Sequence, residues 1–441
     1  MYRRTFVWLL GAGLMAGAVF AAEPQGLPGE NPKPIHLIRR PAEPLSAMAQ
    51  LGRDIFFDTR LSSSGKMSCA SCHSPDHAYG PPNDGPVMLG GPALTQQGAR
   101  AVPSLTYLER QPDFGIGPDD RESENVNLAE KAAVGQTATR ARKTATQTSQ
   151  SAENLVPQGG LFWDGRADTL QIQASGPLLD PREMDGGSIE IIAEKLRDAP
   201  YAKKFAGLFG ERVFKDARLL VAEATFAVGR YQIEDPSFHP YTSKYDYWLE
   251  GKARLSESEM RGLRLFNDPD KANCGGCHIS KPTRDGLPPL FTDFQYEALA
   301  GPRNLALADT QDPNYFDLGI CGPTRKDIAD QTQFCGMFKT PTLRNTAMRR
   351  VFFHNGVFQT LQQVMDFYNF RDTNPEKVYP LAADGKAQKF NDIPVQYHAN
   401  VDVSDPPFDR DLGEAPAMTA QDEADIIEFL KTLNDGYKPE K

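Results

Sequence analysis

Two five-residue motifs, CASCH at residues 69–73 and CGGCH at residues 274–278, combine the side chains that attach haem. In c-type attachment, two cysteine thiols add to the haem vinyl groups and the adjoining histidine binds the iron. A zinc site or a thiol–disulfide redox pair is the alternative, but neither accounts for a histidine directly after both cysteine pairs. The motifs therefore predict two covalently attached haem c groups. The predicted attachment and proximal ligand residues are Cys69, Cys72, Cys274, Cys277, His73 and His278.

The chemistry of such haems depends on the sixth coordination position of each iron. A protein ligand closes that position and favours electron transfer, whereas an open position beside an acid–base residue favours cleavage of a peroxide oxygen–oxygen bond. Two haems therefore predict either an electron carrier or a peroxidase, and the residues on the distal side decide between them.

The other two of the six cysteines, Cys321 and Cys335, form either a disulfide or a pair of buried thiols. The N-terminus favours the disulfide, because residues 1–22 read as a secretory signal peptide in which Arg3 and Arg4 precede a short apolar run and a small-residue cleavage site. The run is short for a membrane anchor, which is the alternative reading. We expect a periplasmic protein with no membrane span after signal removal.

The elements that carry the haem motifs occur twice along the chain. Residues 51–73 and 260–278 each read as a short amphipathic helix, a loop and a haem motif. Further on, FWDGRADTLQIQ at residues 162–173 resembles FFHNGVFQTLQQ at residues 352–363. This repeat predicts an internal duplication and a mostly α fold, with two cytochrome c-like haem domains and long structured loops.

The expected domains are residues 23–250, around the first haem, and residues 251–441, around the second. Ser256 and Glu259 predict a capping box at the start of the second domain. Residues 117–155 form a polar insertion, read either as a mobile surface segment or as a partner-docking or channel-lining loop. Helical periodicity is clear at residues 189–208, 217–231, 361–369 and 421–433.

The formal net charge of −10 argues against nucleic acid as a partner, because phosphate binding needs clustered lysine and arginine. A basic or neutral redox protein suits this surface better.

The chain resembles the bacterial di-haem cytochrome c peroxidase and MauG-like family. The resemblance rests on both haem motifs, on FWDGRA at residues 162–167, on FKTPTLRN at residues 338–345, and on the HNG, TL and FYN motifs within residues 354–369.

This resemblance implies that the N-terminal haem, on His73, reacts with peroxide. It also implies an acid–base role for Glu183, distal-pocket positions for Gln173 and Pro177, and a place between the haems for Trp163. The alternatives are a surface salt bridge for Glu183 and a core position for Trp163.

Tyr368 stands where the standard peroxidases supply a methionine ligand to the second haem, and a tyrosine there is the MauG-like pattern. A phenolate ligand should lower the potential of the iron. The repeat places Pro177 opposite Tyr368, so that one half has a side chain able to bind iron and the other does not. This asymmetry predicts one closed and one open haem. A tyrosine in the core of an apolar helix face is the alternative.

The sequence departs from the family at the histidine that blocks the resting haem of standard peroxidases, because Ala93 stands there. We therefore expect a resting enzyme that is ready for peroxide. Two roles fit His77, in the distal pocket or at a haem propionate, and His354 fits a place beside the second haem or at a propionate. Arg166 and Arg344 are further candidates for propionate pairing.

The family also places a calcium ion between the haems, with an asparagine ligand where this chain has Ala101. Only backbone carbonyls near Thr340 and Pro341 remain as candidate ligands for that ion.

These expectations favour a peroxidase that reduces hydrogen peroxide to water through high-valent haem iron. Its electrons would come from a small redox protein, a cytochrome c or a cupredoxin. A MauG-like oxidation of side chains on a partner protein is the second reading. A non-enzymatic di-haem electron carrier is the third.

Overall fold

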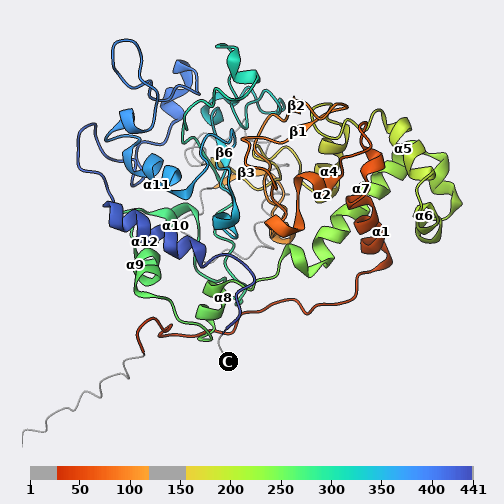
Figure 1. Ribbon diagram of the computed structural model, residues 1–441, viewed down its shortest axis with the longest axis horizontal. Helices are drawn as coiled ribbons and strands as arrows, with labels where there is room; N and C mark the ends of the chain where they lie inside the picture. The colour runs from red at the N-terminus through yellow and green to blue at the C-terminus, as the bar shows by residue number, and fades with distance from the viewer. Residues whose placement is uncertain (1–26, 119–154, 440–441) are drawn as a thin grey trace, which may run out of the picture.

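The computed structural model describes residues 27–118 and 155–439, so the predicted signal peptide and nearly all of the predicted insertion lie outside the described residues. The described chain is mostly helical, as expected, and forms two lobes joined by long loops (Figure 1). The helices of the N-terminal lobe and the link are α1 (Ala47–Phe56), α2 (Cys69–Cys72), α4 (Leu170–Leu179), α5 (Ile189–Arg197), α6 (Ala202–Phe209), α7 (Ala217–Glu234) and α8 (Lys244–Leu249). Those of the C-terminal lobe are α9 (Glu257–Phe266), α10 (Cys274–Cys277), α11 (Leu361–Phe370) and α12 (Ala420–Lys431).

Each lobe is built around one closely packed helix pair. In the N-terminal lobe α1 lies against α7, and a Cβ on Gly52 of α1 would lie 1.8 Å from the Ala227 carbonyl oxygen. In the C-terminal lobe α9 lies against α12, and a Cβ on Gly262 would lie 2.0 Å from the Asp425 carbonyl oxygen. Glycine is therefore required at both crossings, because any side chain would separate the helices.

The loops before α4 and α11 also have matching backbones. Phe162 and Phe353 have φ values of 67° and 66°, and Gly165 and Gly356 have φ values of 67° and 63°. Thr169 and Thr360 then cap their helices, each accepting a backbone N–H three residues further on. These repeated features support the predicted duplication.

The predicted capping box at the start of α9 is confirmed, since Ser256 and Glu259 satisfy one another's backbone N–H groups. The prediction of one helix over residues 189–208 is wrong: α5 ends at Arg197 and α6 begins at Ala202. Pro200 lies in the break. Proline lacks the N–H that a continuous helix would need and clashes with the preceding turn.

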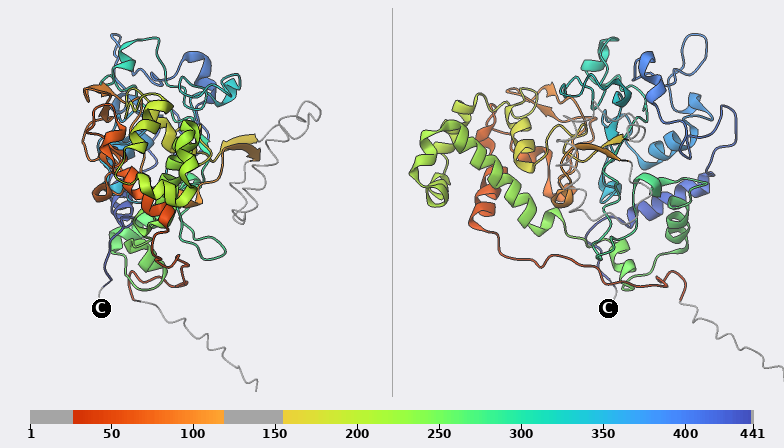
Figure 2. Two further views of the ribbon diagram at one scale, coloured as in Figure 1. Left: turned by 90° about the vertical axis from the view of Figure 1, so that its right-hand side faces the viewer. Right: turned by 180° about the vertical axis from the view of Figure 1, so that it is seen from behind.

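The two largest hydrophobic cores among the described residues belong one to each lobe. The first extends from Leu51 to Phe238, and the second includes Tyr245 and Trp248 of α8 as well as Leu37 from the N-terminal segment. The segment before α1 therefore runs along the C-terminal lobe before it enters its own (Figure 2). The second core begins before residue 250, and the domain limits themselves stay a prediction.

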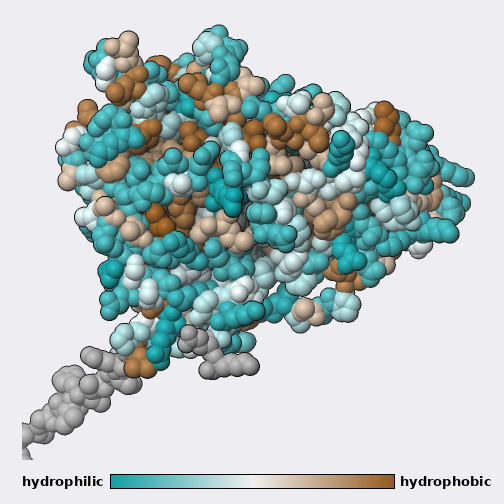
Figure 3. Space-filling view, in the orientation of Figure 1, coloured by the Kyte–Doolittle hydropathy of each residue, from teal (hydrophilic) through white to brown (hydrophobic). Residues whose placement is uncertain are grey.

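The described residues also form three short antiparallel strand pairs. They are β1 (Leu89–Gly90) with β2 (Gln96–Gln97), β3 (Gly115–Pro118) with β4 (Leu155–Gln158), and β5 (Tyr296–Glu297) with β6 (Phe338–Lys339). A bridge from Gln158 to Gln295 links β4 to the neighbourhood of β5 and thereby joins the two halves of the chain. Cys321 and Cys335 form the expected disulfide across a loop before β6. On the face drawn in Figure 3, hydrophobic residues form groups separated by hydrophilic ones.

Candidate active site

The proximal histidine of the N-terminal lobe follows a one-turn helix that carries both cysteines. The His73 backbone N–H donates to the Cys69 carbonyl oxygen at 2.9 Å, and Nδ1 lies 3.0 Å from the Tyr79 carbonyl oxygen. Because a carbonyl only accepts, the proton sits on Nδ1 and leaves Nε2 to bind a metal. Burial lowers the pKa of His73 to about 4, so the imidazole is neutral at pH 7.

The C-terminal lobe repeats this arrangement. The His278 backbone N–H donates to the Cys274 carbonyl oxygen at 2.8 Å, and Nδ1 lies 2.8 Å from the Phe291 carbonyl oxygen. Burial lowers the pKa of His278 to about 4. The two acceptor residues, Tyr79 and Phe291, have nearly equal positive φ values of 53° and 54°. Both histidines are thus oriented by the same local fold.

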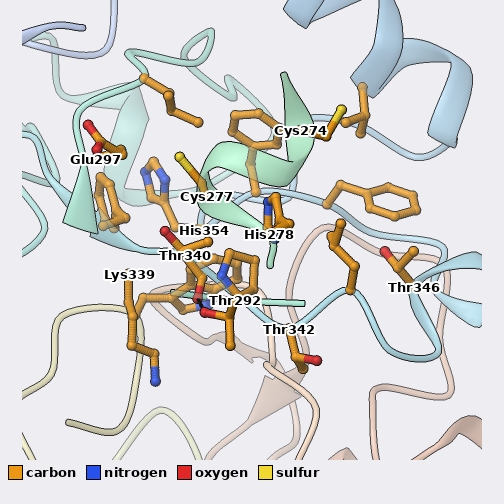
Figure 4. Close-up of a pocket in the computed structure, with 18 of the residues that line it drawn as sticks. Cys274, Cys277, His278, Thr292, Glu297, Lys339, Thr340, Thr342, Thr346 and His354 are labelled. Atoms are coloured by element: carbon orange, nitrogen blue, oxygen red, sulfur yellow. Dashed lines mark hydrogen bonds between the residues drawn. The ribbon is translucent and has the colours of Figure 1, made fainter. Parts of the chain in front are cut away.

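A cavity of about 640 Å³ begins at the C-terminal motif and extends toward the N-terminal lobe. Cys274, Cys277 and His278 line one end, and Trp163 and Gln173 line the part contributed by the N-terminal lobe. Figure 4 shows Cys277 and His278 close together at their end of the cavity. The cavity is therefore lined by residues of both lobes, but Cys69, Cys72 and His73 of the N-terminal motif, and Pro177 and Glu183, are not among its lining residues.

Glu183 lies on a tight loop that follows α4. Its backbone N–H donates to the Asp180 carbonyl oxygen at 3.0 Å, and its carbonyl oxygen accepts the Gly91 N–H at 2.8 Å. A Cβ on Gly90 would lie 2.3 Å from the Arg182 carbonyl oxygen and 2.5 Å from that of Glu183. The absence of a side chain at Gly90 thus allows the two loops to touch and fixes the position of Glu183.

The carboxyl group of Glu183 is poised to exchange a proton near neutral pH. Burial, reinforced by the charge of Asp180, raises the pKa of Glu183 to about 7, against the opposing effect of Arg166 and Arg182. The charge of Glu183 in turn contributes to the raised pKa of the Cys72 thiol, after the larger effect of burial. Glu183 therefore shares an electrostatic environment with the N-terminal haem motif.

Gln173 and Pro177 are four residues apart in α4 and so lie on one face of the helix. Gln173 is buried and lines the cavity. In α11 the equivalent places are taken by Val364 and Tyr368, and both of these line the cavity. One helix thus presents a phenol at the place where the other presents a proline ring.

Tyr368 shares the cavity with the C-terminal motif. Its ring stacks on Phe408, with ring centroids 5.4 Å apart. Burial raises the pKa of Tyr368, and the nearby groups of Cys277 and Cys274 add to this effect. The phenol is therefore close to the predicted second haem, although it is also part of an apolar cluster.

Trp163 contacts both halves of the chain. Its Nε1–H donates to the Ala101 carbonyl oxygen at 2.8 Å, and its own carbonyl oxygen accepts the Lys339 N–H at 2.9 Å. It lines the cavity, which places an indole between the segment before Pro103 and the strand β6.

The two other candidate histidines differ in their surroundings. His77 is half-buried, and its Nδ1 lies 3.1 Å from the Ser74 Oγ. His354 is buried, lines the cavity and stacks on Phe338 with ring centroids 3.6 Å apart. Among the described residues, its Nε2 has no hydrogen-bond partner. His354 is therefore the one that the structure brings to the cavity.

The arginines expected at haem propionates have other partners. Arg166 donates to Asp164 at 2.9 Å. Arg344 forms a two-pronged ion pair with Asp246, at 2.8 and 2.9 Å, and both side chains are fully buried. Asp246 and the Pro289 carbonyl oxygen occupy all three nitrogens of the Arg344 guanidinium, whereas Arg166 uses only Nη1 toward Asp164.

Comparisons with known proteins agree with this geometry. Residues 46–254 match the family model described as di-haem cytochrome c peroxidase. The methylamine utilization protein MauG of Paracoccus denitrificans (strain Pd 1222) is 32% identical over 349 residues, covering 77% of this chain and 79% of the relative. The chain belongs to the di-haem cytochrome c peroxidase family. The crystal structure of the diheme peroxidase BthA from Burkholderia thailandensis E264 is similar along almost the whole length, with a TM-score of 0.75, 35% identity, and coverage of 93% of this chain and 94% of that one. The cytochrome c551 peroxidase of Nitrosomonas europaea is 28% identical over 369 residues, covering 83% of this chain and 84% of the relative.

As a di-haem cytochrome c peroxidase, the chain is an oxidoreductase that carries haem c, and its residues fit that cofactor. Cys69, Cys72, Cys274 and Cys277 are outside the disulfide and remain as thiols for attachment. Each proximal imidazole is neutral, with Nδ1 bonded to a carbonyl and Nε2 left for iron. Within the described ranges, no helix meets the length and hydropathy needed for a membrane span.

The calcium site of this peroxidase family finds less support. The Ala101 carbonyl oxygen already accepts the Trp163 indole N–H, and the Thr340 carbonyl oxygen accepts the Thr292 hydroxyl at 2.7 Å. No group of three or more His, Cys, Asp or Glu side chains that could hold a metal occurs in the part of the chain that the structure describes. The residues present do not fit a carboxylate-bound calcium ion.

Two cations of the cavity were not predicted as part of the peroxidase site. Lys339 and Arg349 both line it. Lys339 belongs to the FKTPTLRN motif. The motif gives no indication that this lysine forms no ion pair among the described residues of the folded chain.

Proposed function

We propose that this enzyme reduces hydrogen peroxide at the haem held by His73, and that the haem held by His278 exchanges electrons with a partner. The observation that carries the proposal is the contrast between α4, where Pro177 offers no iron ligand, and α11, where Tyr368 does. Cys69, Cys72 and His73 would hold the haem, and its iron would supply the chemistry that activates peroxide.

Glu183 is the residue that we propose moves the proton. Peroxide must lose a proton from one oxygen and gain one at the other before the bond between them breaks, and one carboxylate can do both. Burial raises the pKa of Glu183 to about 7, which makes both protonation states accessible at neutral pH. The complete reaction consumes one peroxide, two electrons and two protons and yields two water molecules.

Gln173, Pro177 and Trp163 have supporting roles in this proposal. Gln173 and Pro177 shape the distal side from one face of α4, and the proline keeps a protein ligand away from the metal. The Trp163 indole N–H donates to Ala101, which orients the ring, and its backbone carbonyl accepts the Lys339 N–H, so the residue is held by both halves of the chain. We propose that electrons pass between the lobes through this side chain.

The proposed electron donor is a small periplasmic cytochrome c or cupredoxin. The net charge of −10 suits a neutral or basic partner. Steady-state oxidation of such a reduced carrier should require peroxide and should stay proportional to enzyme concentration. Two six-coordinate haems that do not respond to peroxide would instead identify an electron carrier.

Oxidation of side chains on a partner protein is the second candidate function. It is favoured by Tyr368, which we propose as a ligand of the second iron, and by the 32% identity to a MauG protein. To distinguish the two, the enzyme is incubated with peroxide and neighbouring periplasmic proteins, which are then analysed by mass spectrometry. New oxidised side chains, together with failure to turn over with small carriers, would support this second function.

A further inference from the structure

The buried arginines beside the cavity are mostly paired with carboxylates. Arg344 pairs with Asp246 at 2.8 Å, Arg100 contacts Asp317 at 2.6 Å and Asp164 at 2.7 Å, and Arg303 contacts Asp392 at 3.2 Å. Such pairing is the general rule, since an unpaired charge away from water is costly. Lys339 and Arg349 depart from this rule.

Lys339 holds its ammonium group among neutral atoms. Nζ donates to the Gly160 carbonyl oxygen at 2.8 Å and to the Gln111 amide oxygen at 3.2 Å, which accounts for two of its three N–H donors. No Asp or Glu among the described residues forms an ion pair with it, and the nearby Asp164 is already bound to Arg100 and Arg166. Burial lowers the pKa of Lys339 to about 7. Figure 4 shows the side chain pointing away from Cys277 and His278.

A second lysine uses all three of its N–H donors in hydrogen bonds to neutral atoms. Lys195 donates to three carbonyl oxygens, those of Leu61, Ser62 and Gly186, at 3.0 to 3.2 Å. It is absent from the cavity lining, whereas Lys339 has one donor fewer in use and borders the cavity. Lys339 therefore has both a free donor and an adjacent space for an anion.

Arg349, which also lines the cavity, is likewise bonded to neutral atoms. Its Nη2 donates to the Val102 carbonyl oxygen at 2.9 Å and its Nε donates to the Val351 carbonyl oxygen at 3.3 Å. Among the described residues it forms no ion pair, and burial lowers its pKa to about 10. Its charge contributes to the lowered pKa of His73, so it lies near the N-terminal haem motif although it belongs to the C-terminal half.

The cavity thus has two cations on its wall that lack anionic partners, and haem c brings carboxylates in the form of its propionates. We propose that Lys339 and Arg349 are cationic anchors for haem propionates, with Arg349 reaching from the C-terminal half to the haem on His73. The proposal rests on the proposed function only in that both haems are attached. Because guanidinium and ammonium groups bind carboxylates strongly when water is excluded, both should also tune the iron.

The sign of that tuning follows from charge. A cation beside a haem favours the reduced iron, which carries one positive charge less, so removing it should lower the midpoint potential. Lys339→Gln and Arg349→Gln keep hydrogen-bond donors but remove the charge. Lys339→Arg and Arg349→Lys keep the charge. Lys252→Gln, an exposed cation that pairs with Glu250, is the control for loss of one positive charge at the surface.

Spectroelectrochemical titration of the purified di-haem protein measures the potentials of both irons in each variant. We expect each Gln variant to shift the reduction equilibrium of at least one haem about tenfold or more toward the oxidised form, equivalent to about 59 mV. Arg349→Gln should act mainly on the haem of His73. The charge-preserving variants and Lys252→Gln should stay near wild type.

Equal potentials in wild type and both Gln variants would overturn the inference, as would equal shifts in the Gln and charge-preserving variants. If a Gln variant fails to fold, Lys339→Met or Arg349→Met takes its place, because methionine is apolar and removes the charge while keeping a long side chain. The haem potential of the Met variant should fall below that of the charge-preserving variant, and equal potentials in the two would contradict the proposal. Absence of covalent haem would contradict the proposed function instead, which keeps the two failures distinct.

Discussion

At the scale of single residues, the proposed chemical difference between the halves depends on two side chains. Pro177 and Tyr368 occupy equivalent helix positions, and only the tyrosine carries an atom that can bind iron. We propose no acidic residue in the second half that corresponds to Glu183. We therefore place peroxide chemistry in the N-terminal lobe and electron exchange in the C-terminal lobe.

Glu183→Gln should reduce kcat/KM for peroxide by about 10²- to 10⁴-fold, because the amide cannot carry the proton between the two oxygens. The haem spectrum and thermal unfolding should change little. Glu194→Gln, at an exposed position on α5, is the matched control and should retain wild-type kinetics. Full activity of Glu183→Gln would remove Glu183 from the mechanism.

The peroxide reaction should depend on pH through Glu183. The carboxylate is the form that accepts a proton, and burial raises the pKa of Glu183 to about 7. The rate should therefore rise as pH increases through about 7 and fall below it. The same inflection in Glu183→Gln would mean that another group controls the profile.

At the scale of elements, the sequence specified helices better than the loops that carry the chemistry. The N-cap serine of α9 and the periodicity of α7, α11 and α12 predicted real helices, because caps and apolar faces are local signals. The periodicity across residues 189–208 obscured the break at Pro200. The Gly90 loop and Glu183 are far apart in the sequence, so the contact between them could not be predicted from the sequence alone.

Gly90→Ala tests whether that contact positions Glu183. The added Cβ would lie 2.5 Å from the Glu183 carbonyl oxygen, so the loop must move. We expect a loss of about 1–3 kcal/mol in the free energy of unfolding and a larger relative loss of peroxide activity. Chemical denaturation and peroxide kinetics measure the two effects.

Gly207→Ala on α6 is the control, because no atom lies within 4 Å of its added Cβ. It should leave activity unchanged and stabilise the helix slightly. A Gly90→Ala enzyme with normal kinetics would show that Glu183 does not depend on this contact.

At the scale of the whole molecule, the lobes meet at a shared cavity, and Trp163 contacts both. The haem motifs and the disulfide could be predicted because each has a sequence signal, whereas the duplication stays a prediction that the matching loops before α4 and α11 support. Lys339 and Arg349 could not be predicted as part of the site, because what distinguishes them is that neither forms an ion pair with a carboxylate among the described residues. The ion pair of Arg344 with Asp246 could not be predicted either, because the two residues are 98 positions apart in the chain.

Trp163→Phe should slow electron transfer between the lobes, because the indole and its bond to Ala101 are lost. Stopped-flow mixing of peroxide with enzyme whose second haem alone is reduced measures that transfer. We expect a decrease of about tenfold or more. Trp248→Phe alters an indole in the second core that is outside the cavity lining, and should transfer at the wild-type rate. Equal rates in both variants would exclude Trp163 as the route.

The central claim is that the His73 iron is open and the His278 iron is capped by Tyr368. Low-temperature EPR of the oxidised enzyme and of Tyr368→Phe tests it most directly. We predict one high-spin and one low-spin haem in the wild type, and two high-spin haems in the variant. One equivalent of peroxide should diminish both wild-type signals. Two low-spin haems in the wild type, or a low-spin signal that persists unchanged in Tyr368→Phe, would contradict the account.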